Sequence, residues 1–172
     1  MIEIRHAIPD DAATIQQLAE AIWIPTYSPI LSQAQLRYML DHIYDLESIT
    51  RQIKEGEQTY LLLLVDGEPT GFAAYSARPE NANICKLHKL YCLTETKGKG
   101  YGKKLLQEVE KAVAEARSQI LELNVNKYNP AKGFYERMGY EVVYAEEIPI
   151  GPYIMDDYVM RKVLTHYYSN SQ

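Results

Sequence analysis

Apolar and polar positions recur along the chain with two periods, and these periods divide it into strands and helices. Residues 2–7 alternate as a half-buried strand does, and residues 12–22 place apolar side chains at helical spacing. Pro9 and two aspartates open that helix at the end where its dipole favours negative charge. Residues 24–31 contain two prolines, so we expect the helix to end there.

Two more helices and three strands are predicted next. Ser32 precedes an apolar pattern that reaches Leu40, as a helix N-cap does, and residues 46–53 indicate a third helix. Residues 59–65 and 68–77 are typical of strands, and Asp66-Gly67 between them is a strong hairpin signal. Residues 83–93 predict the third of these strands.

Strands and helices alternate in the second half of the chain. Residues 102–116 predict a helix, residues 120–126 a strand, residues 130–138 a short helix, and residues 140–148 and 153–163 two last strands. A helix between two strands implies parallel pairing through a right-handed crossover. We expect one domain over residues 1–165 and a flexible tail over residues 166–172.

Composition and net charge serve mainly to exclude classes of protein. A chain of 172 residues with 47% hydrophobic and 24% charged residues can bury a core as one domain. No apolar run approaches the roughly 18 residues of a membrane span, and the N-terminus does not resemble a signal peptide. The net charge of −5 argues against general nucleic-acid binding. We therefore expect a cytoplasmic protein with neither a membrane nor a nucleic-acid partner.

The two cysteines predict neither a disulfide nor a metal site. Cys85 and Cys92 fall seven positions apart on one predicted strand, which at about 3.3 Å per residue is too far for a disulfide. Two thiols without clustered ligands also make a poor metal site. We expect free thiols and no bound metal.

One stretch stands out against the acidic background. "TKGKGYGKKLL", residues 96–106, has glycines at alternate positions among four lysines and leads into the predicted helix of residues 102–116. Glycine-rich turns at a helix start present backbone N–H groups to phosphate. A Walker A loop is excluded because Lys104 stands where it needs Ser or Thr, and the third glycine of a dinucleotide fingerprint would fall at Lys103.

The spacing instead resembles the pyrophosphate loop of the GNAT acetyltransferase superfamily, R/Q-x-x-G-x-G/A. Lys97, Gly100 and Gly102 take its three defined positions, and lysine at the first keeps the charge without the planar fork of arginine. A second stretch, "NVNKYNPAKGFYERMGYEVV", resembles a later motif of the same family. It places Asn129 at the family's Asn position, with Tyr128 as the alternative because the spacing is one residue short.

This resemblance, which is good over residues 59–164, implies an α+β GNAT fold. Its central sheet is mixed, has about seven strands, is splayed between strands 4 and 5, and is flanked by helices. Residues 22–40 are similar to PaiA-type polyamine acetyltransferases, which belong to the same superfamily. A homodimer is left open.

The resemblance also implies that acetyl-CoA is the cofactor. The end of the fourth strand would hold its pantetheine arm, the glycine–lysine stretch its pyrophosphate, and the later motif its acyl end. The residues assigned to the cofactor are Leu90, Tyr91, Cys92, Lys97, Gly98, Lys99, Gly100, Tyr101, Gly102, Lys103, Asn129, Phe134 and Tyr135.

Two residues are candidates for proton transfer. Tyr135 holds a proton at neutral pH and can give it to the leaving sulfur; the alternative is that it only packs against the cofactor. His88 can accept the proton of an attacking amine, or it has a structural role. Trp23 and Tyr27 are expected to line the acceptor pocket as aromatic walls for an ammonium group, with ordinary packing as the alternative.

These interpretations predict an N-acetyltransferase that moves acetyl from acetyl-CoA to a primary amine by direct attack. A small cationic amine such as a polyamine is the expected acceptor. The alternatives are a peptide or protein N-terminus or lysine, an amino sugar, and a non-catalytic acetyl-CoA-binding sensor module.

Overall fold

The computed structural model describes residues 1–164, which form two compact units. The first contains Met1–Tyr75 and Lys89–Leu106, and the second contains Ser76–His88 and the chain from Gln107 onward. The single domain over residues 1–165 stays a prediction, and the tail of residues 166–172 lies outside the described residues. No described helix is long and apolar enough to cross a membrane.

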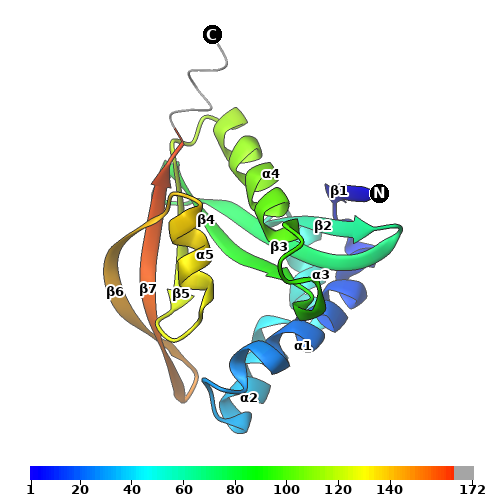
Figure 1. The fold of residues 1–172 in the computed structure, drawn as a ribbon, viewed down its shortest axis with the longest axis vertical. Helices are drawn as coiled ribbons and strands as arrows, with labels where there is room; N and C mark the ends of the chain where they lie inside the picture. Colours follow the sequence, from blue (N-terminus) through cyan, green and yellow to red (C-terminus); the bar gives the residue numbers. More distant parts are fainter. Residues whose placement is uncertain (165–172) are drawn as a thin grey trace. The chain divides into compact units, whose positions relative to one another are not determined.

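The first unit contains the N-terminal helices and the hairpin strands (Figure 1). Its elements are β1 (Ile2–His6), α1 (Ala12–Tyr27), α2 (Gln33–Ile43), α3 (Leu46–Lys54), β2 (Thr59–Val65), most of β3 (Glu68–Arg78), the end of β4 (Asn81–Cys92) and the start of α4 (Tyr101–Glu115).

The second unit contains the remaining strands. Its elements are the end of β3, the start of β4, the rest of α4, β5 (Ile120–Asn126), α5 (Ala131–Arg137), β6 (Glu141–Ile150) and β7 (Tyr153–Val163). Almost every predicted element is therefore present within a few residues of its expected bounds.

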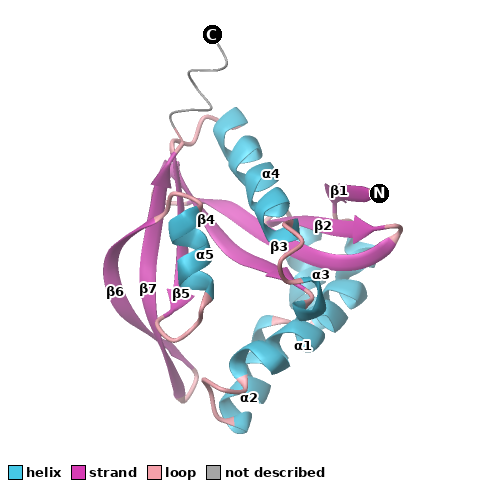
Figure 2. Cartoon of the chain, in the orientation of Figure 1, coloured by secondary structure: helices cyan, strands magenta, loops and turns pink. Residues whose placement is uncertain are grey.

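The strands form a seven-stranded sheet in the order β1-β2-β3-β4-β5-β7-β6, with helices flanking it (Figure 2). β4 and β5 pair in parallel, and the pairings β1–β2, β2–β3, β5–β7 and β6–β7 are antiparallel. The parallel pairing covers Ile84 to Leu87 against Ile120 to Leu123. The α+β class, the mixed sheet and the parallel crossover are as predicted.

Local sequence signals explain several boundaries. Asp66 and Gly67 have φ values of 51° and 82°, as the two central residues of a type I′ hairpin turn require. The Ser32 side chain accepts a hydrogen bond from the N–H of Gln35 at 3.1 Å and so caps α2. Both features confirm the predictions made from turn and cap residues.

The first helix ends within the predicted segment, two residues beyond its first proline. α1 continues through Pro25 and ends at Tyr27, which confirms the prediction that it ends within residues 24–31. Trp23 and Tyr27 on this last turn are each only 4% exposed. Burial of their rings offsets the lost backbone hydrogen bond at Pro25, and the helix ends just before Pro29.

Candidate functional site

The glycine–lysine loop, residues 96–103, lies in the first unit between β4 and α4. Gly98 and Gly100 have φ values of 88° and 80°, in the left-handed region that costs other residues about 1–2 kcal/mol. A Cβ at either position would meet nothing within 4 Å. The glycines therefore serve the backbone conformation, and the surface above them is open.

The start of α4 presents unpaired donors at this loop. Within residues 1–164, the N–H groups of Gly100, Tyr101, Gly102 and Lys103 have no hydrogen-bond acceptor. The first bond of the helix runs from the Lys104 N–H to the Gly100 carbonyl at 3.1 Å. Four consecutive N–H groups at the positive end of a fifteen-residue helix make an anion site, and this arrangement fits the pyrophosphate of coenzyme A.

The lysines of the loop add positive charge to this site. Lys97, Lys99, Lys103 and Lys104 are all exposed, so their ammonium groups can reach an anion on the loop without a desolvation cost. The predicted residues 97–103 thus form one continuous, positively charged segment that leads into α4.

The end of β4 supplies the other predicted cofactor contacts of the first unit. Leu90, Tyr91 and Cys92 are all half-buried. Cys92 is a free thiol whose pKa burial raises to about 11, so it stays protonated at neutral pH and is a weak nucleophile. Cys85 is also free and donates to the Ser118 hydroxyl at 3.3 Å, as expected for a buried structural thiol.

The two predicted acceptor residues lie in an aromatic cluster of the first unit. The Trp23 ring lies 4.6 Å from that of Tyr27 and 5.8 Å from that of Tyr91. Its indole N–H donates to the Tyr44 hydroxyl at 3.2 Å, and the hydroxyls of Tyr27 and Tyr91 lie 3.4 Å apart. The cluster joins α1 to the end of β4. Contact of Trp23 and Tyr27 with an acceptor stays a prediction.

Lys89, which the sequence analysis did not single out, is buried beside this cluster. It is 6% exposed, and its Nζ donates to the Tyr60 hydroxyl at 2.7 Å and to Oε1 of Gln58 at 3.1 Å. Nζ also lies over the rings of Tyr44 and Tyr60, 5.5 and 5.0 Å from their centroids. Burial lowers the pKa of Lys89 to about 7. Strand alternation places Lys89 on the same face as Leu87 and Tyr91, and this was the sequence signal for its burial.

We expect Lys89→Met to change the pH dependence of stability. Between about pH 7 and 10.5 the unfolded chain carries a protonated Lys89 and the folded protein a neutral one. The unfolded state then binds more protons, so the wild-type stability rises with pH through this window. Relative to the variant, the wild type should gain a few kcal/mol of unfolding free energy from pH 6.5 to pH 10. Urea denaturation at both pH values measures this difference.

The exposed Lys111 on α4 provides the matched control, because Lys111→Met removes an ammonium that is already in water. Its difference from the wild type should be the same at both pH values. A pH-independent difference for Lys89→Met as well would contradict a neutral, buried Lys89.

In the second unit, α5 positions Tyr135. This tyrosine is 7% exposed, and its ring lies edge-on to Phe134 at 5.3 Å and to Tyr140 at 5.8 Å. Asn129 is buried, and its Oδ1 accepts from the Ala131 N–H at 2.9 Å, which fixes the first turn of α5. The roles of these residues toward cofactor or substrate stay predictions.

His88 ends the part of β4 that belongs to the second unit. Its Nε2 lies 2.7 Å from the Ser76 hydroxyl of β3, and the ring is exposed. An exposed imidazole can exchange protons with solvent, as a general base must. Its catalytic role stays a prediction.

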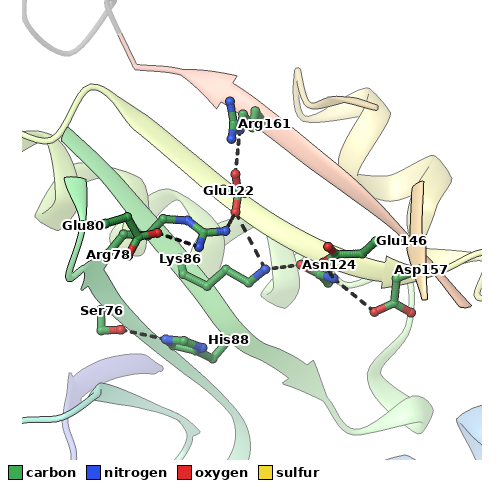
Figure 3. A network of polar contacts seen from close by, with 10 residues as sticks. All are labelled: Ser76, Arg78, Glu80, Lys86, His88, Glu122, Asn124, Glu146, Asp157 and Arg161. Carbon is green, nitrogen blue, oxygen red and sulfur yellow. Dashed lines mark hydrogen bonds and ion pairs between the residues drawn. The ribbon is translucent and has the colours of Figure 1, made fainter. Parts of the chain in front are cut away.

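His88 borders a polar network that the sequence analysis missed (Figure 3). At its centre, Glu122 of β5 is fully buried and accepts from Arg161 at 2.6 Å and from Arg78, with Lys86 3.9 Å away. The same figure shows Asn124, Glu146 and Asp157 beyond Lys86. Alternating polar residues on strands 4, 5 and 7 were the signal, but their pairing depends on sheet register.

The residues predicted for one site thus fall into two groups, each within its own unit. The first unit holds the glycine–lysine loop, the end of β4, Trp23 and Tyr27. The second holds His88 and the α5 residues Phe134 and Tyr135 with Asn129 before them. Among residues 1–164, no three His, Cys, Asp or Glu side chains gather as a metal site would require.

Comparison with known proteins gives concordant matches. Residues 27–150 match the sequence family "Acetyltransferase (GNAT) domain". The chain is 27% identical over 146 residues to a spermidine N(1)-acetyltransferase of Thermoplasma acidophilum, covering 82% of this chain and 89% of the relative.

Solved structures show the same fold. The PaiA N-acetyltransferase of Thermoplasma acidophilum, crystallised with coenzyme A, aligns with a TM-score of 0.82 at 27% identity over 95% of this chain and 99% of that one. The ribosomal-protein-S18-alanine N-acetyltransferase of Escherichia coli aligns with a TM-score of 0.71 at 14% identity over 95% and 94% of the two chains. The second likeness concerns the fold alone.

Proposed function

The chain belongs to the GNAT acetyltransferase family and is an acetyl-CoA-dependent N-acetyltransferase, and from this premise we propose that its acceptor is a small cationic amine such as a polyamine. The observation that supports the binding of acetyl-CoA is the row of unpaired N–H groups at the start of α4. The proposal of a polyamine-like acceptor is supported by the 27% identity to a relative that is itself named a spermidine acetyltransferase.

The chain's own residues would divide the binding of the cofactor between them. The loop N–H groups and the exposed lysines would hold the pyrophosphate, and backbone groups of Leu90, Tyr91 and Cys92 would hold the pantetheine arm. When bound, acetyl-CoA supplies an acetyl group activated as a thioester.

Direct attack by the amine is favoured over an acetylated cysteine. Burial keeps Cys92 protonated, and Cys85 is buried against Ser118, so neither thiol is poised as a nucleophile. His88 would take the proton of the amine directly or through water, and the Tyr135 hydroxyl would give a proton to the departing sulfur.

A panel of acceptors tests this proposal. We expect thiol release from acetyl-CoA with spermidine and related polyamines, and much slower release with peptides and aminoglycosides. Turnover with peptides alone would overturn the acceptor class. Tight acetyl-CoA binding by calorimetry with no turnover on any amine would favour the non-catalytic sensor module.

A further inference from the structure

Two carboxylates of the second unit have no part in the reaction proposed above. Glu146 of β6 and Asp157 of β7 are directly opposite each other in the β6–β7 pairing, and we call them the Glu146–Asp157 pair. Asn124 of β5 bridges them, because its Nδ2 donates to Oε1 of Glu146 at 2.9 Å and to Oδ2 of Asp157 at 3.3 Å (Figure 3). A neutral amide therefore links two negative charges.

Asp157 is incompletely paired despite its burial. It is 6% exposed, and its Oδ1 has no hydrogen-bond partner within the described part of the chain. Burial raises the pKa of this carboxyl above its ordinary value. Like charges directly opposite on paired strands are destabilising, and a buried unpaired oxygen costs about 1–3 kcal/mol. Both costs call for a cation that the chain does not supply.

Within the described residues, none of the cations of the network makes a direct hydrogen bond or ion pair with Glu146 or Asp157. Arg78 and Arg161 are both bound to Glu122, which is fully buried between them. Lys86 contacts Oδ1 of Asn124 and feels the charges of Glu146 and Asp157, although burial and the charge of Arg78 lower its pKa to about 8. Of the cations labelled in Figure 3, only Lys86 acts on Glu146 and Asp157, so one negative charge is left over there when both carboxylates are ionised.

We propose that the Glu146–Asp157 pair binds one ammonium group of the acceptor, distal to the amine that is acetylated. An ammonium there would donate to the unpaired Oδ1 of Asp157 and to Glu146 through charge-assisted hydrogen bonds. This inference rests on the proposed function and narrows its substrate class to linear amines with at least two ammonium groups.

The position of the pair on the sheet agrees with such a substrate. Lys86 pairs with Glu122, and His88 and Asn124 each lie two residues further along the same strands, so all four share one face. β4 and β7 both neighbour β5, and Asp157 is paired with Asn126, two residues beyond Asn124, so two strand spacings and a two-residue offset separate His88 from Asp157 by roughly 12 Å. A linear amine with a spacer of several methylenes spans that distance, and a monoamine cannot.

Asp157→Asn tests the inference with a matched substrate pair, diaminobutane and butylamine. We expect KM for diaminobutane to rise about ten- to hundred-fold with kcat little changed, while kcat/KM for butylamine stays at the wild-type value. Equal effects on both amines, or no effect on either, would overturn the proposal.

Three further variants keep the test informative if Asp157→Asn folds poorly. Glu146→Gln should act in the same direction as Asp157→Asn. Lys86→Met removes the competing ammonium and should lower KM for diaminobutane. Glu147→Gln is the control, since this exposed neighbour is opposite Asp156 in the pairing and not Asp157, and its KM values should match the wild type.

The failure of this inference can be told from failure of the proposed function. If the wild type acetylates neither amine, spermidine binding to the acetyl-CoA-bound protein is measured by calorimetry instead. Binding that Asp157→Asn weakens about ten-fold or more supports the subsite without catalysis. Absent binding, or binding equal in both proteins, overturns the subsite.

Discussion

Replacing Gly100 with aspartate is expected to abolish binding of coenzyme A. At a φ of 80° a side chain strains the loop, and the new carboxylate would lie beside the N–H groups that we propose bind the pyrophosphate. Strain of about 1–2 kcal/mol combined with charge repulsion should weaken affinity by about a hundred-fold or more. Isothermal titration calorimetry with coenzyme A measures the loss.

Two controls separate charge from backbone strain. Gly100→Asn has nearly the same shape without the charge, and Asn tolerates the left-handed conformation, so its affinity should fall much less. Gly56→Asp creates the same left-handed aspartate at a φ of 71° after α3, away from the loop, and should bind coenzyme A as the wild type does. Unchanged affinity in Gly100→Asp would show that the pyrophosphate binds elsewhere.

Removing the hydroxyl of Tyr135 is expected to slow turnover strongly while leaving cofactor binding intact. Tyr135→Phe keeps the buried ring and its edge-on contacts with Phe134 and Tyr140, and removes only the proposed proton donor. Loss of a general acid typically costs about 10²- to 10⁴-fold in rate. We therefore expect kcat to fall by that factor, measured by thiol release, with the affinity for acetyl-CoA close to that of the wild type.

Tyr140→Phe provides the structural counterpart in the same aromatic group. The Tyr140 hydroxyl donates to the buried Glu110 at 2.7 Å, so this variant should lose melting temperature and keep its kcat. If Tyr135→Phe also loses only stability, with kcat preserved, Tyr135 is a packing residue and another group protonates the sulfur.

The sequence predicted those features that depend on near neighbours along the chain. The Asp66-Gly67 turn, the Ser32 cap and the glycine–lysine loop each follow from the conformations that a few consecutive residues permit. The strand and helix periods then indicated a parallel pair with a crossover, which β4 and β5 form. The α+β class and the cofactor loop could therefore be predicted before any tertiary contact was known.

Details were missing from the prediction where distant residues compete with local preference. The sequence placed the end of α1 within residues 24–31, but only the burial of Trp23 and Tyr27 explains why the helix runs two residues past Pro25 at the loss of one hydrogen bond. The sequence did not determine that Lys89 is buried against Tyr44 and Tyr60, because these contacts join residues that are distant along the chain.

What the sequence by itself determined is the set of elements, their order and the anion loop, because backbone conformation is set mostly by adjacent residues. Only the tertiary structure decided that Asn124, Glu146 and Asp157 meet, since three strands must pair in one register to bring them together. A shift of one residue in either pairing would turn these side chains to opposite faces. The charges that such contacts bury, and hence the pKa values they change, cannot be known before that register is formed.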